Sequence, residues 1–335
     1  MTWEPASICL LLPACLFNAW KKVINMNLAM SRFRSPAKAA AAAEDRHIVL
    51  PDGRKLSYSE FGSARGLPVL GFHGTPGSRF MFRLVHEPAR RLGMRIIAPE
   101  RPGFGLSTYQ HNRTLADWAG DVAVLAHQLG LSQFAVAGIS GGGPYAAACA
   151  ALLPGKVTAA ALISPVGPLC PPEGPETIGT ARYVTFRLLP RITPAMKGAF
   201  SLGRLMFLNA PDSMYGFIRR RACPADRRIL HRPDIRRNLL DGVSEGLRPG
   251  IRGVIQEMRI FCRPWDIPFD AVQAPVLLWQ GTNDGNVPVS ASLQLARLIP
   301  GCELHRLEGA GHYWIFEHIE EVLRAIRNKM NPHSL

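Results

Sequence analysis

The amino-acid sequence predicts an α/β fold, in which a parallel sheet carries helices on both faces. The first observation is that short apolar runs, suited to strands buried on both faces, alternate with stretches whose apolar residues recur at helical spacing. The second is that this alternation stops in a long stretch rich in proline and arginine and then resumes. The chain has 335 residues, 47% of them hydrophobic and 19% charged, which is ample material for a globular core. Strands that alternate with helices form βαβ units, so a helical insertion divides one α/β domain.

The elements before the insertion follow one another in a regular order. From His47, two strand-like runs flank Pro51-Asp52-Gly53, which is a hairpin signal. The later strands are continuous apolar runs, and the two long helical stretches that follow the hairpin each end at a glycine, a common helix stop. We expect strands at 67–74, 94–100, 133–140 and 156–165, and helices at 78–93, 115–130 and 142–153.

The alternation breaks after Pro165. Residues 165–176 (PVGPLCPPEGPE) hold five prolines and are typical of a linker, and the chain from about 177 to 266 is helix-rich and broken by Gly and Pro. The alternation then returns, with strands expected at 274–281 and 302–309 and helices at 290–298 and 315–330. We therefore expect an extension at 1–46, an α/β core formed by 47–167 and 267–335, and an inserted helical segment at 168–266.

The net charge of +14 is concentrated in the insertion. Between Arg182 and Arg263 there are 17 Lys and Arg but 6 Asp and Glu. A solvated, arginine-rich helical face explains this pattern most simply. The alternatives are that these charges attract an anionic substrate or that they bind an anionic membrane surface. The sequence shows no zinc-finger spacing, no RNA-binding sheet motif and no basic run interleaved with aromatic residues, so we expect no nucleic-acid partner.

The N-terminal extension contains an apolar stretch at 6–20. It is short for a membrane span, Pro13 interrupts it, and no Lys or Arg precedes it as in a secretory signal. We expect residues 1–46 to be disordered, with Met26 and Met30 as alternative starts; a membrane-associating segment and a targeting signal stay open. The seven cysteines are irregularly spaced with no C-x-x-C pair, which favours reduced thiols in a cytoplasmic protein over a disulfide framework or a zinc site.

One serine stands in a glycine-rich turn. The stretch FAVAGISGGGPYAAA (134–148) contains G-x-S-x-G, with Ser140 between Gly138 and Gly142, where a predicted strand ends and a predicted helix begins. Such a nucleophile elbow strains its central residue, and a Cβ at either glycine would clash with the neighbouring strand or helix. The adjacent helix N-terminus favours negative charge on the hydroxyl. Ser140 is therefore the candidate nucleophile.

A serine hydroxyl needs a base to take its proton, and the base needs a carboxylate to orient it. His312 lies in a glycine-rich loop after the last predicted strand, and Asp284 lies in a turn-rich loop after the preceding one. Each has an ordinary interpretation, as an exposed loop histidine and as a turn-forming aspartate. The chain order Ser140, Asp284, His312 is nevertheless the order of α/β-hydrolases, and each residue follows its own strand.

Acyl transfer also requires N–H donors for the developing oxyanion. One is the backbone N–H of Gly141, directly after the candidate nucleophile. The other is expected in the loop HGTPGS (73–78), where we assign it to Thr75 because Pro76 has no N–H. His73, in the same loop, is interpreted as a structural residue rather than as the base.

These motifs resemble those of the α/β-hydrolase superfamily over roughly residues 47–330. The resemblance implies an eight-stranded, mostly parallel sheet with a helical lid inserted after the sixth strand, and it gives Ser140, His312, Asp284 and the backbones of Thr75 and Gly141 the roles assigned above. Glu100 stands where many relatives carry Asp, at a structural position, and Gly141 stands where many carry an aromatic residue, which leaves the subfamily open. The resemblance rests on HGTPGS (73–78), RPGFGLS (101–107), GISGGG (138–143), GTNDGNVP (281–288) and GAGH (309–312).

The expected function is that of a serine esterase, which hydrolyses an ester or related acyl bond through an acyl-enzyme. Relatives with an aspartate nucleophile are disfavoured by Ser140, whereas C–C hydrolases, acyltransferases and proline iminopeptidase-like peptidases share the triad. The lid has few acids to bind a substrate ammonium, so the peptidase ranks below the esterase. A non-catalytic ligand-binding protein on the same fold is the alternative of another class. No cofactor or metal is implied, the partner is a small-molecule substrate, and membrane association through residues 6–20 stays open.

Overall fold

The structure is a computed structural model that describes residues 45–265 and 267–330, all within one compact unit. The expectations for residues 1–44, including the apolar stretch at 6–20, lie outside the described residues. None of the helices within residues 45–265 and 267–330 has the length and apolar character that a membrane span requires.

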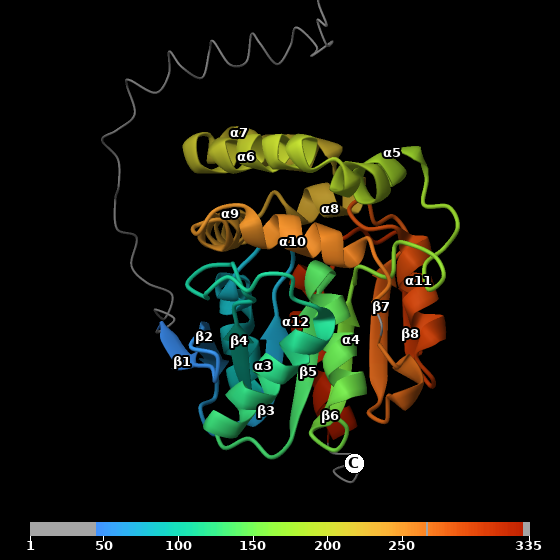
Figure 1. The fold of residues 1–335 in the computed structure, drawn as a ribbon. Helices are drawn as coiled ribbons and strands as arrows, with labels where there is room; N and C mark the ends of the chain where they lie inside the picture. Colours follow the sequence, from blue (N-terminus) through green and yellow to red (C-terminus); the bar gives the residue numbers. More distant parts are fainter. Residues whose placement is uncertain (1–44, 266, 331–335) are drawn as a thin grey trace, which may run out of the picture. The chain divides into compact units, whose positions relative to one another are not determined.

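The core is an eight-stranded sheet with the strand order β1-β2-β4-β3-β5-β6-β7-β8 (Figure 1). β1 pairs antiparallel with β2, and β2 pairs antiparallel with β4, whereas the other neighbours are parallel. The predicted α/β fold with a mostly parallel sheet is confirmed. The strands are β1 (Arg46–Val49), β2 (Lys55–Gly62), β3 (Leu67–Phe72), β4 (Met94–Pro99), β5 (Phe134–Ile139), β6 (Val157–Ile163), β7 (Val276–Gly281) and β8 (Glu303–Leu307).

Helices cover both faces of this sheet. Alternate residues of each central strand point to opposite faces, so that Leu70 and Phe72 of β3 join one core cluster and Val69 joins the other. The first cluster contains α3 (Leu115–Gln128), α4 (Gly143–Leu152) and α11 (Val289–Leu298), and the second contains α2 (His86–Arg91) and α12 (Ile315–Met330). Because both faces are covered, the central strands are apolar throughout, as their sequences indicated.

The helix predicted at 78–93 is divided in two. Residues 79–85 form the 3₁₀ helix η1 (Arg79–Val85), which Ser78 caps by accepting from the backbone N–H of Phe80, and α2 follows. Pro88 lies in the first turn of α2, where its missing N–H has no intrahelical partner to lose. The stretch is helical as its spacing predicted, but the regular α-helix begins only near Pro88.

Between β6 and β7 the chain forms a helical insertion in two layers. Figure 1 shows α6 and α7 outermost, with α9 and α10 between them and the sheet. The outer layer continues from α5 through two short helical turns, η3 and η4. The insertion comprises α5 (Thr180–Tyr183), η3 (Val184–Leu188), η4 (Leu189–Arg191), α6 (Thr193–Asn209), α7 (Pro211–Arg221), α8 (Pro224–Ile229), α9 (Pro233–Gly246) and α10 (Arg252–Phe261).

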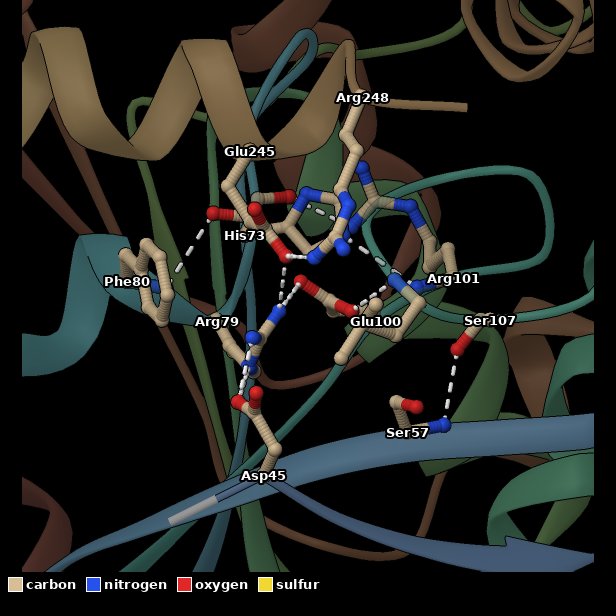
Figure 2. Close-up of polar contacts among 12 residues, drawn as sticks. Asp45, Ser57, His73, Arg79, Phe80, Glu100, Arg101, Ser107, Glu245 and Arg248 are labelled. Carbon is tan, nitrogen blue, oxygen red and sulfur yellow. Dashed lines mark hydrogen bonds and ion pairs between the residues drawn. The ribbon is translucent and has the colours of Figure 1, made fainter. Parts of the chain in front are cut away.

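Carboxylates of the inner layer tie the insertion to arginines of the core. Glu245 of α9 accepts from Arg79 Nη1 at 3.0 Å, and Asp241 of the same helix accepts from Arg83 Nη1 at 2.9 Å. Arg79 is almost fully buried and also pairs with Asp45 and Glu100, as Figure 2 shows. The insertion is therefore attached to the core by charge pairs as well as by apolar packing.

Candidate active site

Four strands end at one edge of the sheet, and each is followed by a residue that the sequence analysis selected. Thr75 follows β3, Ser140 follows β5, Asp284 follows β7 and His312 follows β8. These strands belong to the run β3-β5-β6-β7-β8, in which all neighbours are parallel. Their carboxyl ends therefore bring loops that are distant in the sequence to the same edge.

Ser140 occupies a strained turn between β5 and α4. Its φ is +54°, in the left-handed region that residues with a side chain rarely adopt. A Cβ on Gly138 would lie 2.3 Å from the carbonyl oxygen of Gly142, and a Cβ on Gly142 would lie 2.2 Å from that of Phe72. The two glycines thus permit backbone contacts that no larger residue allows, and the local geometry is that of a nucleophile elbow.

His312 and Asp284 form a buried pair. His312 Nδ1 lies 2.7 Å from Asp284 Oδ2. The other carboxylate oxygen, Oδ1, accepts from the backbone N–H groups of Asn286 at 2.8 Å and Val287 at 3.0 Å, and Oδ2 also accepts from Gln280 Nε2 at 3.1 Å. An ionised carboxylate only accepts hydrogen bonds, so the proton is assigned to Nδ1 and the lone pair to Nε2. Asp284 therefore orients the ring as a general base requires.

The charges of this pair shift both pKa values. Burial acts to raise the pKa of Asp284, but the imidazolium charge of His312 and the hydrogen bonds to the carboxylate outweigh it and lower that pKa. Burial acts to lower the pKa of His312, but the Asp284 carboxylate outweighs it and raises that pKa above its usual 6.5. The carboxylate thus stabilises the protonated form that a base reaches after it accepts a proton.

A residue of the insertion holds the His312 loop in place. Asp226 of α8 accepts from the backbone N–H of His312 at 2.7 Å and from that of Tyr313 at 2.9 Å. A Cβ on Gly311 would lie only 2.1 Å from Asp226 Oδ2, which explains the glycine before the histidine. The sequence analysis missed Asp226, because no local pattern connects a helical aspartate with a loop 86 residues later.

The predicted oxyanion donors lie against each other. A Cβ on Gly141 would lie 3.2 Å from the Thr75 nitrogen and closer still to the Thr75 side chain. Both residues also line the cavity described below, together with Ser140. The structure therefore places the backbones of Thr75 and Gly141 side by side beside the candidate nucleophile.

A buried ionic network packs against the loop that contains Thr75 (residues 73–78, the Thr75 loop). Glu257 of α10 accepts from Arg101 Nε at 2.5 Å, from Arg113 Nη2 at 2.8 Å and from the Thr75 hydroxyl, and the side chains of Glu257 and both arginines are at most 1% exposed. Arg101 also donates to the carbonyl oxygen of His73 at 2.5 Å. Burial would raise the pKa of Glu257, but the charges of Arg101 and Arg113 lower it to about 2. The insertion thus supplies the carboxylate around which the loop is built, which the sequence analysis did not identify.

The two residues interpreted as structural are buried away from the cavity. His73 is fully buried, with Nδ1 2.8 Å from the Gly74 carbonyl oxygen and Nε2 accepting from the Arg101 backbone N–H at 3.3 Å. Glu100 pairs with Arg79 (Figure 2) and accepts from the Leu106 backbone N–H at 2.7 Å. Burial raises the pKa of Glu100 to about 7 against the opposing charge of Arg79. Both residues act in the packing of the loops that surround the site.

Ser140 and His312 open into one cavity of about 490 Å³ beneath the insertion. The size is that of a pocket for a small molecule. The lining is mostly apolar, and among the described residues that form it there is no Asp, Glu, Lys or Arg. The arginines of the insertion therefore do not charge the cavity wall. The apolar side chains that the insertion contributes are Phe186, Phe207, Ile218, Leu239, Val243, Met258 and Phe261.

Comparison with known proteins agrees with this architecture. The model of the alpha/beta hydrolase fold family matches residues 68–319, which include all the predicted site residues. The chain belongs to the alpha/beta hydrolase family. A non-heme chloroperoxidase from Streptomyces lividans is 29% identical to this hydrolase-family chain over 287 residues, covering 82% of the chain and 95% of the relative.

Two further proteins show what else this chain is similar to. A 2-hydroxymuconate semialdehyde hydrolase from Pseudomonas putida is 26% identical over 289 residues, covering 84% of this chain and 92% of the relative. The solved structure of a thermophilic esterase from Thermogutta terrifontis superposes with a TM-score of 0.63 at 23% identity, covering 87% of this chain and 99% of that one. The named activities of these relatives differ, so the comparisons fix the family and the fold rather than the reaction.

Proposed function

We propose that this chain is a serine hydrolase that cleaves an ester or related acyl bond through an acyl-enzyme. The observation that carries the proposal is the position of Ser140 and His312 on the wall of one cavity, with the Asp284 carboxylate 2.7 Å behind the imidazole. A nucleophile on a strained elbow and a base oriented by a buried carboxylate are the parts that acyl transfer requires.

In the proposed mechanism, Ser140 Oγ attacks the substrate carbonyl carbon as His312 Nε2 takes the hydroxyl proton. The carbonyl oxygen becomes an oxyanion, which accepts hydrogen bonds from the backbone N–H groups of Thr75 and Gly141. His312 then gives the proton to the leaving alcohol as the carbon–oxygen bond breaks. A water molecule, deprotonated by His312, then attacks the acyl carbon. The second oxyanion collapses, the acyl–Oγ bond breaks and releases the acid, and His312 returns the proton to Ser140 Oγ.

The cavity favours a neutral ester with an apolar acyl group. Its described lining contains no Lys or Arg to attract a carboxylate and no Asp or Glu to bind a substrate ammonium. Glu257 of α10, which accepts from the Thr75 hydroxyl, is already paired with Arg101 and Arg113. These features rank an esterase above an aminopeptidase, and they leave the basic charge of the insertion without a role in substrate binding.

A fluorophosphonate probe tests the proposal directly. We expect stoichiometric labelling of the wild-type protein and none of Ser140→Ala, with a matched control, Ser132→Ala, labelled like the wild type because Ser132 is exposed on a surface turn before β5. A p-nitrophenyl ester series of rising acyl length then maps the cavity. A folded wild-type protein that is neither labelled nor active on any ester would contradict the proposal and favour a ligand-binding protein on this fold.

A further inference from the structure

The outer layer of the insertion carries an unusual concentration of exposed apolar side chains. Of the ten large hydrophobic side chains that are exposed in the described chain, eight lie between residues 183 and 217. On α6 they recur at three-residue intervals, with Leu202 56%, Leu205 57% and Leu208 44% exposed, so that they share one side of the helix. The other five are Tyr183, Val184, Leu188, Ile192 and Phe217.

The same layer is apolar on its inner side. Phe186, Phe207 and Ile218 line the cavity, while exposed apolar side chains occupy neighbouring positions on each of the same three elements. A helix of a globular protein that is apolar on both sides is normally buried on both sides. The inner side is covered by the cavity and the inner layer, so the outer side is built to contact something apolar.

The charge of the outer layer indicates what that contact is. Residues 183–221 contain seven Lys and Arg and one acid, Asp212, and that acid is paired with Arg236 of α9. Arg191, Lys197, Arg220 and Arg221 are exposed, and the Arg221 guanidinium lies over the Phe217 ring at 5.2 Å. The surface thus combines apolar side chains with cations, and the part of it that the structure describes has no exposed acid without a partner.

We propose that the outer layer, residues 183–221, docks on an anionic lipid bilayer surface. Leucines of α6 and the exposed apolar residues between 183 and 192 would enter the interface, while the exposed Lys and Arg side chains meet the lipid phosphates and carboxylates. A second copy of this chain is a poorer partner, because a two-fold interface would place this cationic face against itself.

This docking would bring the candidate active site close to the lipid. α6 presents Phe207 to the cavity and Leu205 and Leu208 to the outside, so a single helix, about 10 Å across, separates the two. An apolar ester dissolved in the bilayer would then lie next to the roof of an apolar cavity. In this proposal the basic residues of the insertion, which do not line the cavity, bind the anionic membrane surface.

Vesicle co-sedimentation of the full-length protein tests this inference. The probes are vesicles of phosphatidylcholine alone and of equal parts phosphatidylcholine and phosphatidylserine. We expect binding to the anionic vesicles, weaker binding to the neutral ones, and loss of the difference at high salt. Sedimentation reads binding and not turnover, so the result does not depend on the proposed chemistry of Ser140.

Two triple variants locate the contact. Replacing Lys197, Arg220 and Arg221 with Gln should weaken anionic-vesicle binding roughly a hundredfold, at about fivefold for each charge. Replacing Leu202, Leu205 and Leu208 with Gln should weaken binding at least about tenfold to both kinds of vesicle. Circular dichroism and the thermal melting temperature check that both variants fold.

Matched controls remove exposed side chains of the same chemical kind elsewhere. For charge, the control replaces Arg65, Lys156 and Arg297, all exposed outside the insertion, with Gln. For apolar surface, it replaces Val49 of β1 and Leu304 of β8, the two exposed hydrophobic residues on the edge strands, with Gln. Both controls should bind like the wild type.

Three outcomes would overturn the inference. The first is no binding to either vesicle. The second is binding that both insertion variants leave unchanged, which would assign it to another part of the chain, such as residues 6–20. The third is a dimer, seen by sedimentation velocity, that the leucine variant dissociates while the wild type ignores vesicles, which would assign the face to a second copy.

Discussion

Neutralising Glu257 tests how strongly the insertion is bound to the Thr75 loop. The substitution Glu257→Gln keeps the size of the side chain but removes its charge, and it leaves Arg101 and Arg113 buried without their counter-ion. Since a one-unit pKa shift is about 1.4 kcal/mol, the fall of the Glu257 pKa from 4.5 to about 2 on folding corresponds to about 3 kcal/mol of stability. Breaking a buried ion pair by removing one partner typically costs about 3–5 kcal/mol, and the value obtained from the pKa shift lies at the lower end of this range.

Urea unfolding followed by tryptophan fluorescence measures this loss. With an m value near 3 kcal/mol/M, the midpoint of Glu257→Gln should fall by about 1 M relative to the wild type. The matched control is Glu87→Gln, which removes an exposed pair with Arg90 and should change stability by less than about 0.5 kcal/mol. Turnover should fall as well, because Arg101 and Thr75 lose the carboxylate that orders the loop.

The pH dependence of the stability difference between the wild type and Glu257→Gln is a sharper test than its size at one pH. A carboxylate whose pKa is depressed by folding contributes stability above its unfolded pKa of 4.5 and loses it as the pH falls toward about 2. The difference in the free energy of unfolding between the wild type and Glu257→Gln should therefore be constant above pH 4.5, and it should shrink as the pH falls below 4.5. A gap of less than about 1 kcal/mol at pH 7, or one that widens in acid, would refute the reasoning.

Four further predictions concern the site itself. Asp284→Asn should lower kcat by about 10⁴-fold with an unchanged circular dichroism spectrum, because His312 loses its orienting partner, and near-normal turnover would place the acid elsewhere. Because the base acts in its neutral form and the pKa of His312 is raised, the acid limb of kcat/KM in the wild type should have its midpoint above 6.5; a midpoint below 6.5 would contradict the Asp284 contact. Gly311→Ala would force a Cβ to 2.1 Å from Asp226 Oδ2, so it should lower both the melting temperature and kcat, and a variant with wild-type values would show that this loop adapts freely. Anionic and neutral esters of equal length should respond alike to salt, since the cavity has no described Lys or Arg, and a KM that rises with salt for the anionic ester alone would mean that the insertion attracts it.

The sheet and the candidate triad could be predicted from the sequence because their signals are local. Each central strand is a continuous apolar run, and Ser140, Asp284 and His312 each follow such a run in a glycine-rich or turn-rich loop. Parallel strands gather their carboxyl ends at one edge, so short patterns were sufficient to bring distant loops together.

The insertion could not be predicted in the same way. Glu257 lies on an amphipathic helix, and its contact with Thr75 spans 182 residues, so no local spacing marks it as different from a solvated acid. The sequence also could not show which way the arginine side chains of the insertion point, because a count of charges does not say whether they face a cavity or its exterior. The division of the predicted helix into η1 and α2 was missed because helical spacing alone does not distinguish a 3₁₀ turn from an α-helical one.

The Asp226 contact has a consequence for engineering. The inserted segment is an attractive unit to exchange, since it forms much of the cavity wall in this chain. However, the Asp226 carboxylate of α8 holds the backbone of His312 and Tyr313, so a chimaera that replaces the segment also removes the anchor of the proposed base. A transplanted segment would have to bring an acceptor to the same two amides, and residues 224–229 are best kept with the recipient core.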